Sequence, residues 1–174
     1  MITLYSAIRD ELKTGDLIAW NTPKVTSFFT FVLYMYQKIL KAKYTHVGVI
    51  VREGSRVFVL EATPPVVRLY PLSFSPEFFY IPVNRDDLED ELDHILHALG
   101  KPYSLLDFIK GLLKIKADDR EYYCSELASE FYNRVGYIED EWAGLTPDTL
   151  VRAVCKAGNV KPVFVKNDWG NTHV

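Results

Sequence analysis

The sequence predicts an α+β protein, with strands concentrated in the first half and helices in the second. Short runs rich in β-branched and aromatic residues, separated by turn residues, recur between residues 16 and 83. Segments with helical periodicity and helix stop signals dominate residues 85–158. The 174 residues are 48% hydrophobic and 25% charged, which is typical of a globular chain. We therefore expect one α+β domain over residues 1–174.

Six segments have the composition of strands. Two of them surround the turn sequence EGS, which is typical of a β-hairpin. Two others run into proline, which cannot continue the hydrogen-bonding ladder of a central strand. The predicted strands cover residues 16–20, 45–52, 56–63, 66–72, 78–83 and 161–166.

Five segments have helical periodicity. Gly100 and Gly136 are stop signals, and Thr146 or Asp148 caps the last helix, with Pro147 in its first turn. The predicted helices cover residues 24–41, 85–100, 104–116, 124–136 and 146–158.

The most apolar run is Val25–Tyr36, which a basic segment follows. It is shorter than the ~20 apolar residues that a transmembrane helix needs, so it predicts a buried helix. A helix lying at a membrane surface is the alternative, and it would make the protein a peripheral membrane protein.

Several classes of function are disfavoured by composition. The net charge of −3 gives no electrostatic footprint for nucleic acid. The N-terminus has no basic segment followed by an apolar one, so a cytoplasmic location is expected by default, unless the chain is delivered by another route. Two cysteines do not make a disulfide framework; free thiols are expected, although the two can also pair.

No metal or other cofactor is expected from the ligand spacing. His94 and His97 lie one turn apart on a predicted helix, with Asp90 a turn earlier, but no further ligand follows at a recognisable spacing. Neither cysteine belongs to a C-x-x-C motif. A solvated helix face explains these histidines.

The hairpin brings His46 and Glu61 to one face of the sheet. Paired residues on antiparallel strands point to the same face. A two-residue loop at Glu53-Gly54 sets His46 opposite Glu61, and a four-residue loop over Glu53–Arg56 sets Gly48 opposite Glu61, on the same face as His46. Only an odd loop or a bulge separates the two side chains. An exposed glutamate beside an exposed histidine is the structural alternative.

Cys124 opens the predicted helix 124–136. The start of a helix has free N–H groups and a partial positive charge, which favour a thiolate and can bind an oxyanion. With His46 as a base and Glu61 orienting it, these groups make an acyl-transfer triad. A buried structural cysteine is the alternative for Cys124 taken alone.

The order of these segments resembles the circularly permuted branch of the NlpC-type, papain-like cysteine peptidases, the YaeF/YiiX-like group. The resemblance rests on TGDLIAW, YTHVGVIV, VLEATP, LGKPYSLLDF, YYCSELASEFYNRVG and LTPDTL, and it spans roughly residues 12–152. It implies a small antiparallel sheet or partial barrel packed against helices. The histidine precedes the cysteine here, which leaves the mechanism intact because a triad is defined by geometry.

The resemblance implies that Cys124 is the nucleophile, His46 the base and Glu61 the orienting residue. Candidates for an additional oxyanion donor or for the pocket wall are Tyr44, Tyr122, Tyr123 and Trp20. No cofactor is implied. Many cell-wall-directed relatives have an export signal or wall-binding domains, and this sequence shows neither. The source is bacterial or phage on this resemblance.

Three functions follow as alternatives. The first is a cysteine amidase or peptidase acting on a small peptide such as a cell-wall stem peptide. The second is an acyltransferase or phospholipase of the lecithin:retinol acyltransferase-like type, for which the apolar run and its basic flank would meet a membrane. The third is a binding module that has kept the cleft without activity.

Overall fold

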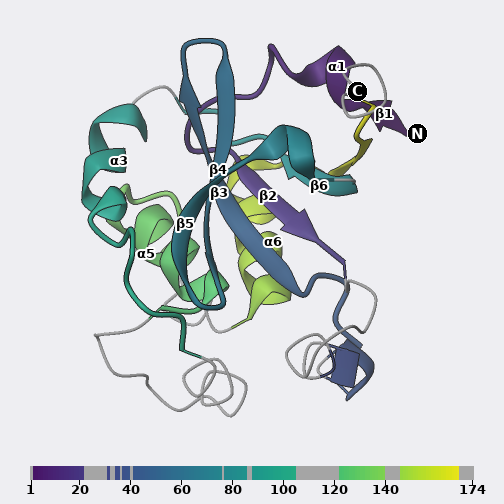
Figure 1. Cartoon of the computed structure of the whole chain (residues 1–174). Coiled ribbons are helices and arrows are strands. Elements are labelled where there is room, and N and C mark those ends of the chain that lie inside the picture. The colour runs from purple at the N-terminus through teal and green to yellow at the C-terminus, as the bar shows by residue number, and fades with distance from the viewer. Residues whose placement is uncertain are drawn as a thin grey trace.

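The computed structural model of the chain describes residues 2–21, 31, 34–35, 37–39, 41–75, 77–85, 88–104, 122–139 and 146–168. Within these ranges one sheet of seven strands packs against helices, which confirms the α+β class (Figure 1). The strands are β1 (Thr3–Leu4), β2 (Leu17–Trp20), β3 (His46–Glu53), β4 (Arg56–Thr63), β5 (Val66–Pro71), β6 (Glu77–Ile81) and β7 (Val163–Lys166). The helices are α1 (Tyr5–Ile8), η1 (Leu72–Phe74), α3 (Leu88–Leu96), α5 (Cys124–Arg134) and α6 (Pro147–Gly158).

The strand order in the sheet is β1-β7-β6-β2-β3-β4-β5. All neighbouring pairs are antiparallel except β1 and β7, which run parallel, so the sheet is mixed and not purely antiparallel as expected. The six predicted strands are all present to within a few residues. β1 and α1 were not predicted, because two- and four-residue elements are too short for a periodic signal.

The sheet separates two groups of buried apolar side chains. On one face, Val49 and Leu60 belong to a core shared with α3, α5 and α6. On the other face, Ile18 and Ile50 pack with Tyr5 of α1. Figure 1 shows α5 well away from α1, with β3 and β4 between them. This alternation along each strand is what a sheet covered on both faces requires.

The helices begin and end where local chemistry predicts. In α6, the Thr146 hydroxyl oxygen accepts a hydrogen bond from the Thr149 amide at 3.1 Å, and the Thr149 hydroxyl oxygen accepts one from the Thr146 amide. Pro147 is the first helical residue. After α5, Gly136 takes a φ of +63°, which an L side chain rarely adopts. These residues fix the start of α6 and the end of α5.

Asp16 is a buried carboxylate that ties the start of β2 to the end of β6. It accepts hydrogen bonds from the amide of Val83 at 2.7 Å, the hydroxyl of Tyr80 at 3.0 Å and the amide of Lys13 at 2.8 Å. Burial raises the pKa of Asp16, and these three bonds oppose the rise. The acid of the TGDLIAW segment is therefore structural.

The described residues of the predicted helix over Val25–Tyr36 are helical, but the prediction that this helix is buried is wrong for them. Phe31, Tyr34 and Met35 are 47%, 38% and 39% exposed, and Ile39 beyond them is 69% exposed. Apolar composition indicates a helix whose side chains favour burial, but it does not identify the part of the protein that packs against them. Among the described residues no helix is both long and apolar enough to cross a membrane. The predicted helix over residues 104–116 lies outside the described residues from 105 onward.

Candidate functional site

Cys124 is the first residue of α5 and is 2% exposed. The preceding residue, Tyr123, is extended (φ −112°, ψ 167°), and its side chain makes no capping hydrogen bond to the helix. The first amide groups of a helix have no acceptor within the helix. The sulfur therefore lies beside backbone N–H groups that no side-chain cap at this position engages.

His46 and Glu61 are hydrogen-bonded across the hairpin. His46 Nε2 lies 2.6 Å from Glu61 Oε2, and the two side chains are 17% and 7% exposed. The β3–β4 register pairs Val49 with Leu60, and continuing it sets Gly48 opposite Glu61. This is the second of the two predicted registers. The loop that gives it is shorter than the predicted four residues: Glu53 pairs with Arg56, so only Gly54 and Ser55 form the turn.

Gly48 leaves the space that this diagonal contact needs. A Cβ atom at this position would lie 2.4 Å from Val59 Cγ2, 2.9 Å from the Leu60 carbonyl oxygen and 3.3 Å from Glu61 Cβ. Diagonal neighbours across two strands are within reach of long side chains only when nothing stands between them. The glycine therefore lets the Glu61 carboxylate pass toward His46.

Arg68 on β5 holds the other oxygen of Glu61. Its Nε and Nη2 atoms donate to Glu61 Oε1 at 2.9 and 2.8 Å, while its guanidinium lies 4.6 Å from the centre of the Tyr70 ring. Arg68 was not among the predicted site residues, although the sequence contains a signal for it. With Pro64-Pro65 as a two-residue turn, Glu61 falls opposite Arg68, as the β4–β5 register shows.

These contacts set the ionisation of the pair. Burial acts to raise the pKa of Glu61, but its bonds and charge interactions with His46 and Arg68 outweigh this and lower it. Burial acts to lower the pKa of His46, but the charge and hydrogen bond of Cys124, with those of Glu61, raise it to about 10. Because Nε2 bonds Glu61, Nδ1 is left for the sulfur.

The four weaker candidates, Trp20, Tyr44, Tyr122 and Tyr123, lie in different surroundings. Trp20 is paired with His46 in the β2–β3 ladder, and their rings lie 5.1 Å apart, so it is a wall of the site. Tyr123 is the residue before Cys124 and is buried. Tyr44 packs edge-on against Phe79 in the core.

Tyr122 lies beneath a lysine and beside a tyrosine that the sequence analysis did not single out. Its ring lies 4.9 Å from Lys101 Nζ, and its backbone forms a bridge with Tyr103. Burial raises the pKa of Tyr103, with further contributions from Cys124 and Tyr123. Tyr103 therefore remains a neutral phenol near the sulfur, and a neutral phenol can donate a hydrogen bond.

The second cysteine differs from the first. Cys124 and Cys155 are both free, but Cys155 lies inside α6. Burial raises the pKa of Cys155, and the neighbouring Lys43 opposes this. In the described part of the chain, no group of three or more His, Cys, Asp or Glu side chains is arranged to hold a metal ion.

The comparison with solved structures finds the same fold in another protein. The chain aligns with the crystal structure of metalloprotein YiiX from Escherichia coli O157:H7, with a TM-score of 0.55 and 21% sequence identity. The alignment covers 87% of each chain. The chain therefore shares the overall fold of YiiX.

Sequence comparisons are more limited. No protein-family model matches the chain. An uncharacterised protein of Acanthamoeba polyphaga mimivirus is 33% identical over 60 residues, which is 34% of this chain and 24% of the viral protein. The match thus spans about a quarter of that relative. What these comparisons establish is a fold of the YiiX type, the group to which the motifs of the sequence pointed.

Proposed function

We propose that the chain is a cysteine hydrolase that cleaves an amide bond in a small peptide, such as a cell-wall stem peptide. The observation that carries the proposal is the 2.6 Å bond between His46 and Glu61, next to the cysteine that opens α5. A nucleophile, a base that contacts it and a carboxylate that orients the base are the parts that acyl transfer needs. The peptide substrate is supported by the sequence resemblance.

In this mechanism the Cys124 thiolate attacks the carbonyl carbon of the scissile amide. His46, protonated at neutral pH because its pKa is about 10, gives its Nδ1 proton to the leaving amine as the C–N bond breaks. The product is a thioacyl-enzyme and a free amine. Water then attacks the thioester, His46 takes the proton of that water, and the carboxylic acid leaves as Cys124 is restored.

The negative oxygen of each tetrahedral intermediate needs donors that are already in place. The first amides of α5 lie beside Cys124 and have no capping side chain from Tyr123. The Tyr103 phenol, whose pKa burial raises, is a further donor of the right kind. Glu61 remains ionised throughout, since Arg68 and His46 both lower its pKa.

The test is to trap the thioacyl-enzyme. The full chain is incubated with stem-peptide fragments, short peptides and p-nitrophenyl acetate, and the intact mass is followed by spectrometry. We expect a mass increase of one acyl group located on Cys124, absent in Cys124→Ala and retained in Cys155→Ala. Acylation of Cys124→Ala at the rate of the wild type would refute the proposal.

Transfer of acyl groups on lipids is a second candidate, favoured by one observation. Phe31, Tyr34 and Met35 are exposed, and Lys38 lies beside them with its Nζ 5.5 Å from the Tyr34 ring. An exposed apolar face with a cation suits an anionic membrane surface. Co-sedimentation with phosphatidylserine vesicles at low salt, followed by deacylation assays, decides between the two. The lipid candidate predicts binding that Met35→Asp weakens, and absence of binding at low salt removes it.

A further inference from the structure

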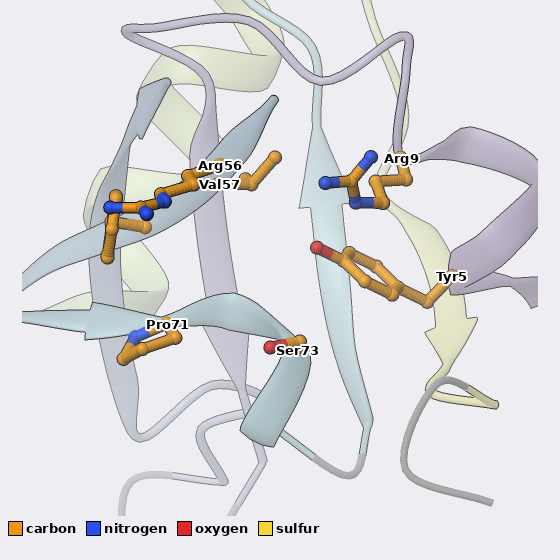
Figure 2. A pocket seen from close by; sticks show the side chains of 7 residues that line it. Tyr5, Arg9, Arg56, Val57, Pro71 and Ser73 are labelled. Carbon is orange, nitrogen blue, oxygen red and sulfur yellow. The ribbon is translucent and has the colours of Figure 1, made fainter. Parts of the chain in front are cut away.

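The cavity in Figure 2 does not gather its charged groups into one site. It measures about 330 Å³ and lies between α1, the first residues of β4 and the junction of β5 with η1. Arg56 precedes Val57 on β4, so the two side chains point to opposite faces of the sheet. Figure 2 shows the Arg56 guanidinium extending away from Arg9 and from the Tyr5 hydroxyl. Ligand sites need polar groups that converge, and a cation near Cys124 is placed differently.

That cation is Lys101, which lies along the outer edge of β5. The Val67 amide donates to the Lys101 carbonyl oxygen at 2.9 Å, and the Gly100 amide donates to the Val67 carbonyl oxygen at 3.0 Å. The antiparallel bridge between Val66 and Pro102 continues this pairing and sets Lys101 opposite Val67. Opposite residues on antiparallel strands point to the same face. Val67 belongs to the core shared with α5, so Lys101 lies on the face of the sheet that α5 covers.

Tyr122 connects Lys101 to the candidate nucleophile. Lys101 Nζ lies 4.9 Å from the centre of the Tyr122 ring, and Tyr103, two residues after Lys101, forms a parallel bridge with Tyr122. Tyr123 is extended (φ −112°, ψ 167°), and the residues on either side of an extended residue point the same way. Tyr122 and Cys124 therefore lie on one side of the backbone, and the Lys101 ammonium lies on that side too.

The Lys101 ammonium contacts an aromatic ring but no carboxylate. Lys101 is half-buried, and in the part of the chain that the structure describes it forms no ion pair. A ring attracts the ammonium through its face, but it does not satisfy three N–H donors. Glu61, the buried acid of the site, already accepts from Arg68 and is bonded to His46. An anionic group on a ligand would complete the contacts of Lys101.

We propose that the Cys124 site takes substrates with a carboxylate close to the scissile amide, and that Lys101 binds this carboxylate. The inference rests on the proposed hydrolase function and adds a substrate class to it. One ammonium matches the single charge of a carboxylate, whereas a phosphate monoester has close to two charges and suits the fork of a guanidinium better. The net charge of the chain is −3, so its attraction for an anion is local to the cations of the site.

The test compares two thiol reagents that differ by one carboxylate, N-ethylmaleimide and 3-maleimidopropionate. The full chain is treated with each at pH 7 and low salt, and labelling of Cys124 and Cys155 is followed by mass spectrometry. We expect Lys101→Met to lower the ratio of the anionic to the neutral labelling rate at Cys124 by about threefold or more, the size of a partly exposed ion pair. Lys101→Arg should keep the ratio because it keeps the charge, and Lys101→Glu should lower it further.

Lys166→Met is the matched control. Lys166 is an exposed lysine on β7, and four strands separate β7 from β5 in the sheet. This variant should keep the wild-type ratio at Cys124, and Lys101→Met should keep the wild-type ratio at Cys155. The charge of His46 is present in every variant, so changes in the ratio report Lys101 alone. A wild-type ratio at Cys124 in Lys101→Met would overturn the inference.

The same experiment separates this inference from the hydrolase proposal. If Cys124 reacts with neither reagent, the site has no accessible nucleophile and both proposals fail. If Cys124 reacts quickly with both reagents at a ratio that Lys101→Met does not change, the hydrolase proposal stands and the carboxylate site is removed.

A competition experiment identifies the anion. N-acetylglutamate should slow the labelling of Cys124 by N-ethylmaleimide more than N-acetylglutamine does, and Lys101→Met should abolish this difference. Slowing by glycerol 3-phosphate but not by N-acetylglutamate would contradict a carboxylate substrate.

Discussion

The chain has two cysteines, in two helices that pack against each other, and their surroundings could hardly be less alike. Cys124 begins α5, where it meets His46 and the uncapped start of a helix. Cys155 lies within α6, where burial raises the pKa of its thiol and Lys43 opposes the rise. Both are small, free thiols in amphipathic helices. The difference teaches that the chemistry of a cysteine follows its place in the helix and the groups that face it.

The largest difference between the surroundings of Cys124 and Cys155 is the histidine His46, which interacts with Cys124. His46→Ala removes both the base and the positive charge next to Cys124, and it should slow thioacylation by about 10²- to 10⁴-fold, the range for loss of a general acid–base. Cys124 would then resemble Cys155. Stopped-flow release of p-nitrophenol measures the rate.

His94→Ala is the matched control, since the His94 side chain is 52% exposed and lies 4.0 Å from Glu91. It should react as the wild type does. A His46→Ala variant that keeps the wild-type rate would remove the histidine from the mechanism.

Arg68 supports the carboxylate behind that histidine, and its loss should have a smaller effect. Arg68→Met removes one of the two groups that lower the pKa of Glu61, so this pKa rises. As the pH falls, Glu61 is then protonated earlier than in the wild type, and activity is lost at a higher pH. A group with a lowered pKa keeps its contribution above its ordinary value and loses it as the pH falls. We expect about a tenfold lower rate at pH 6, which corresponds to the free energy of one hydrogen bond to a charged group. The loss at pH 8 should be smaller.

The control for Arg68 is Arg134→Met. Arg134 is also half exposed, at 47% against 46%, and also pairs with a glutamate, Glu91 at 3.2 Å. Its loss should leave the pH profile in place. If Arg68→Met lowers activity equally at every pH, Arg68 is a packing residue and does not position Glu61.

Gly48 tests whether the diagonal contact depends on space. In Gly48→Ala the new Cβ meets Val59 and the Leu60 carbonyl, so the free energy of unfolding should fall by about 1–3 kcal/mol, the usual cost of overpacking. Urea denaturation measures it. The comparison is Gly54→Asn: nothing lies within 4 Å of a Cβ there, and asparagine tolerates its φ of +56°. Equal stability of the two variants would mean that the strands adjust to a Cβ at Gly48.

Cys155→Ser should have the smallest effect. The thiol is partly exposed and far less constrained than Cys124, so the free energy of unfolding should change by less than about 1 kcal/mol and thioacylation should be unchanged. A large loss of activity would mean that Cys155, and not only Cys124, contributes to the site.

Much of the site could be predicted because local patterns specified it. Strand alternation put His46 and Glu61 on one face for any even loop, and a helix start was readable at Cys124. Arg68 was missed because the pairing arithmetic stopped at β4, although the next turn extends it by the same rule. Tyr103 could not be found, because its place beside Cys124 arises from a backbone bridge to Tyr122 between segments distant in sequence.

The fold was readable where elements are long enough to show a period. β1 and α1 are too short, and β1 depends on pairing with β7 at the other end of the chain. The exposure of Phe31, Tyr34 and Met35 was not predicted, because apolar composition does not say which neighbour covers a helix.

The central claim is that Cys124 is a nucleophile activated by His46, and the most direct measurement is alkylation of both cysteines in one molecule. The full chain is treated with iodoacetamide at pH 6, and peptides containing Cys124 and Cys155 are quantified by mass spectrometry over time. We expect Cys124 to react at least about tenfold faster than Cys155 because a thiolate is the reactive form, with the advantage lost in His46→Ala. Equally slow reaction of the two cysteines in the wild type would contradict the claim.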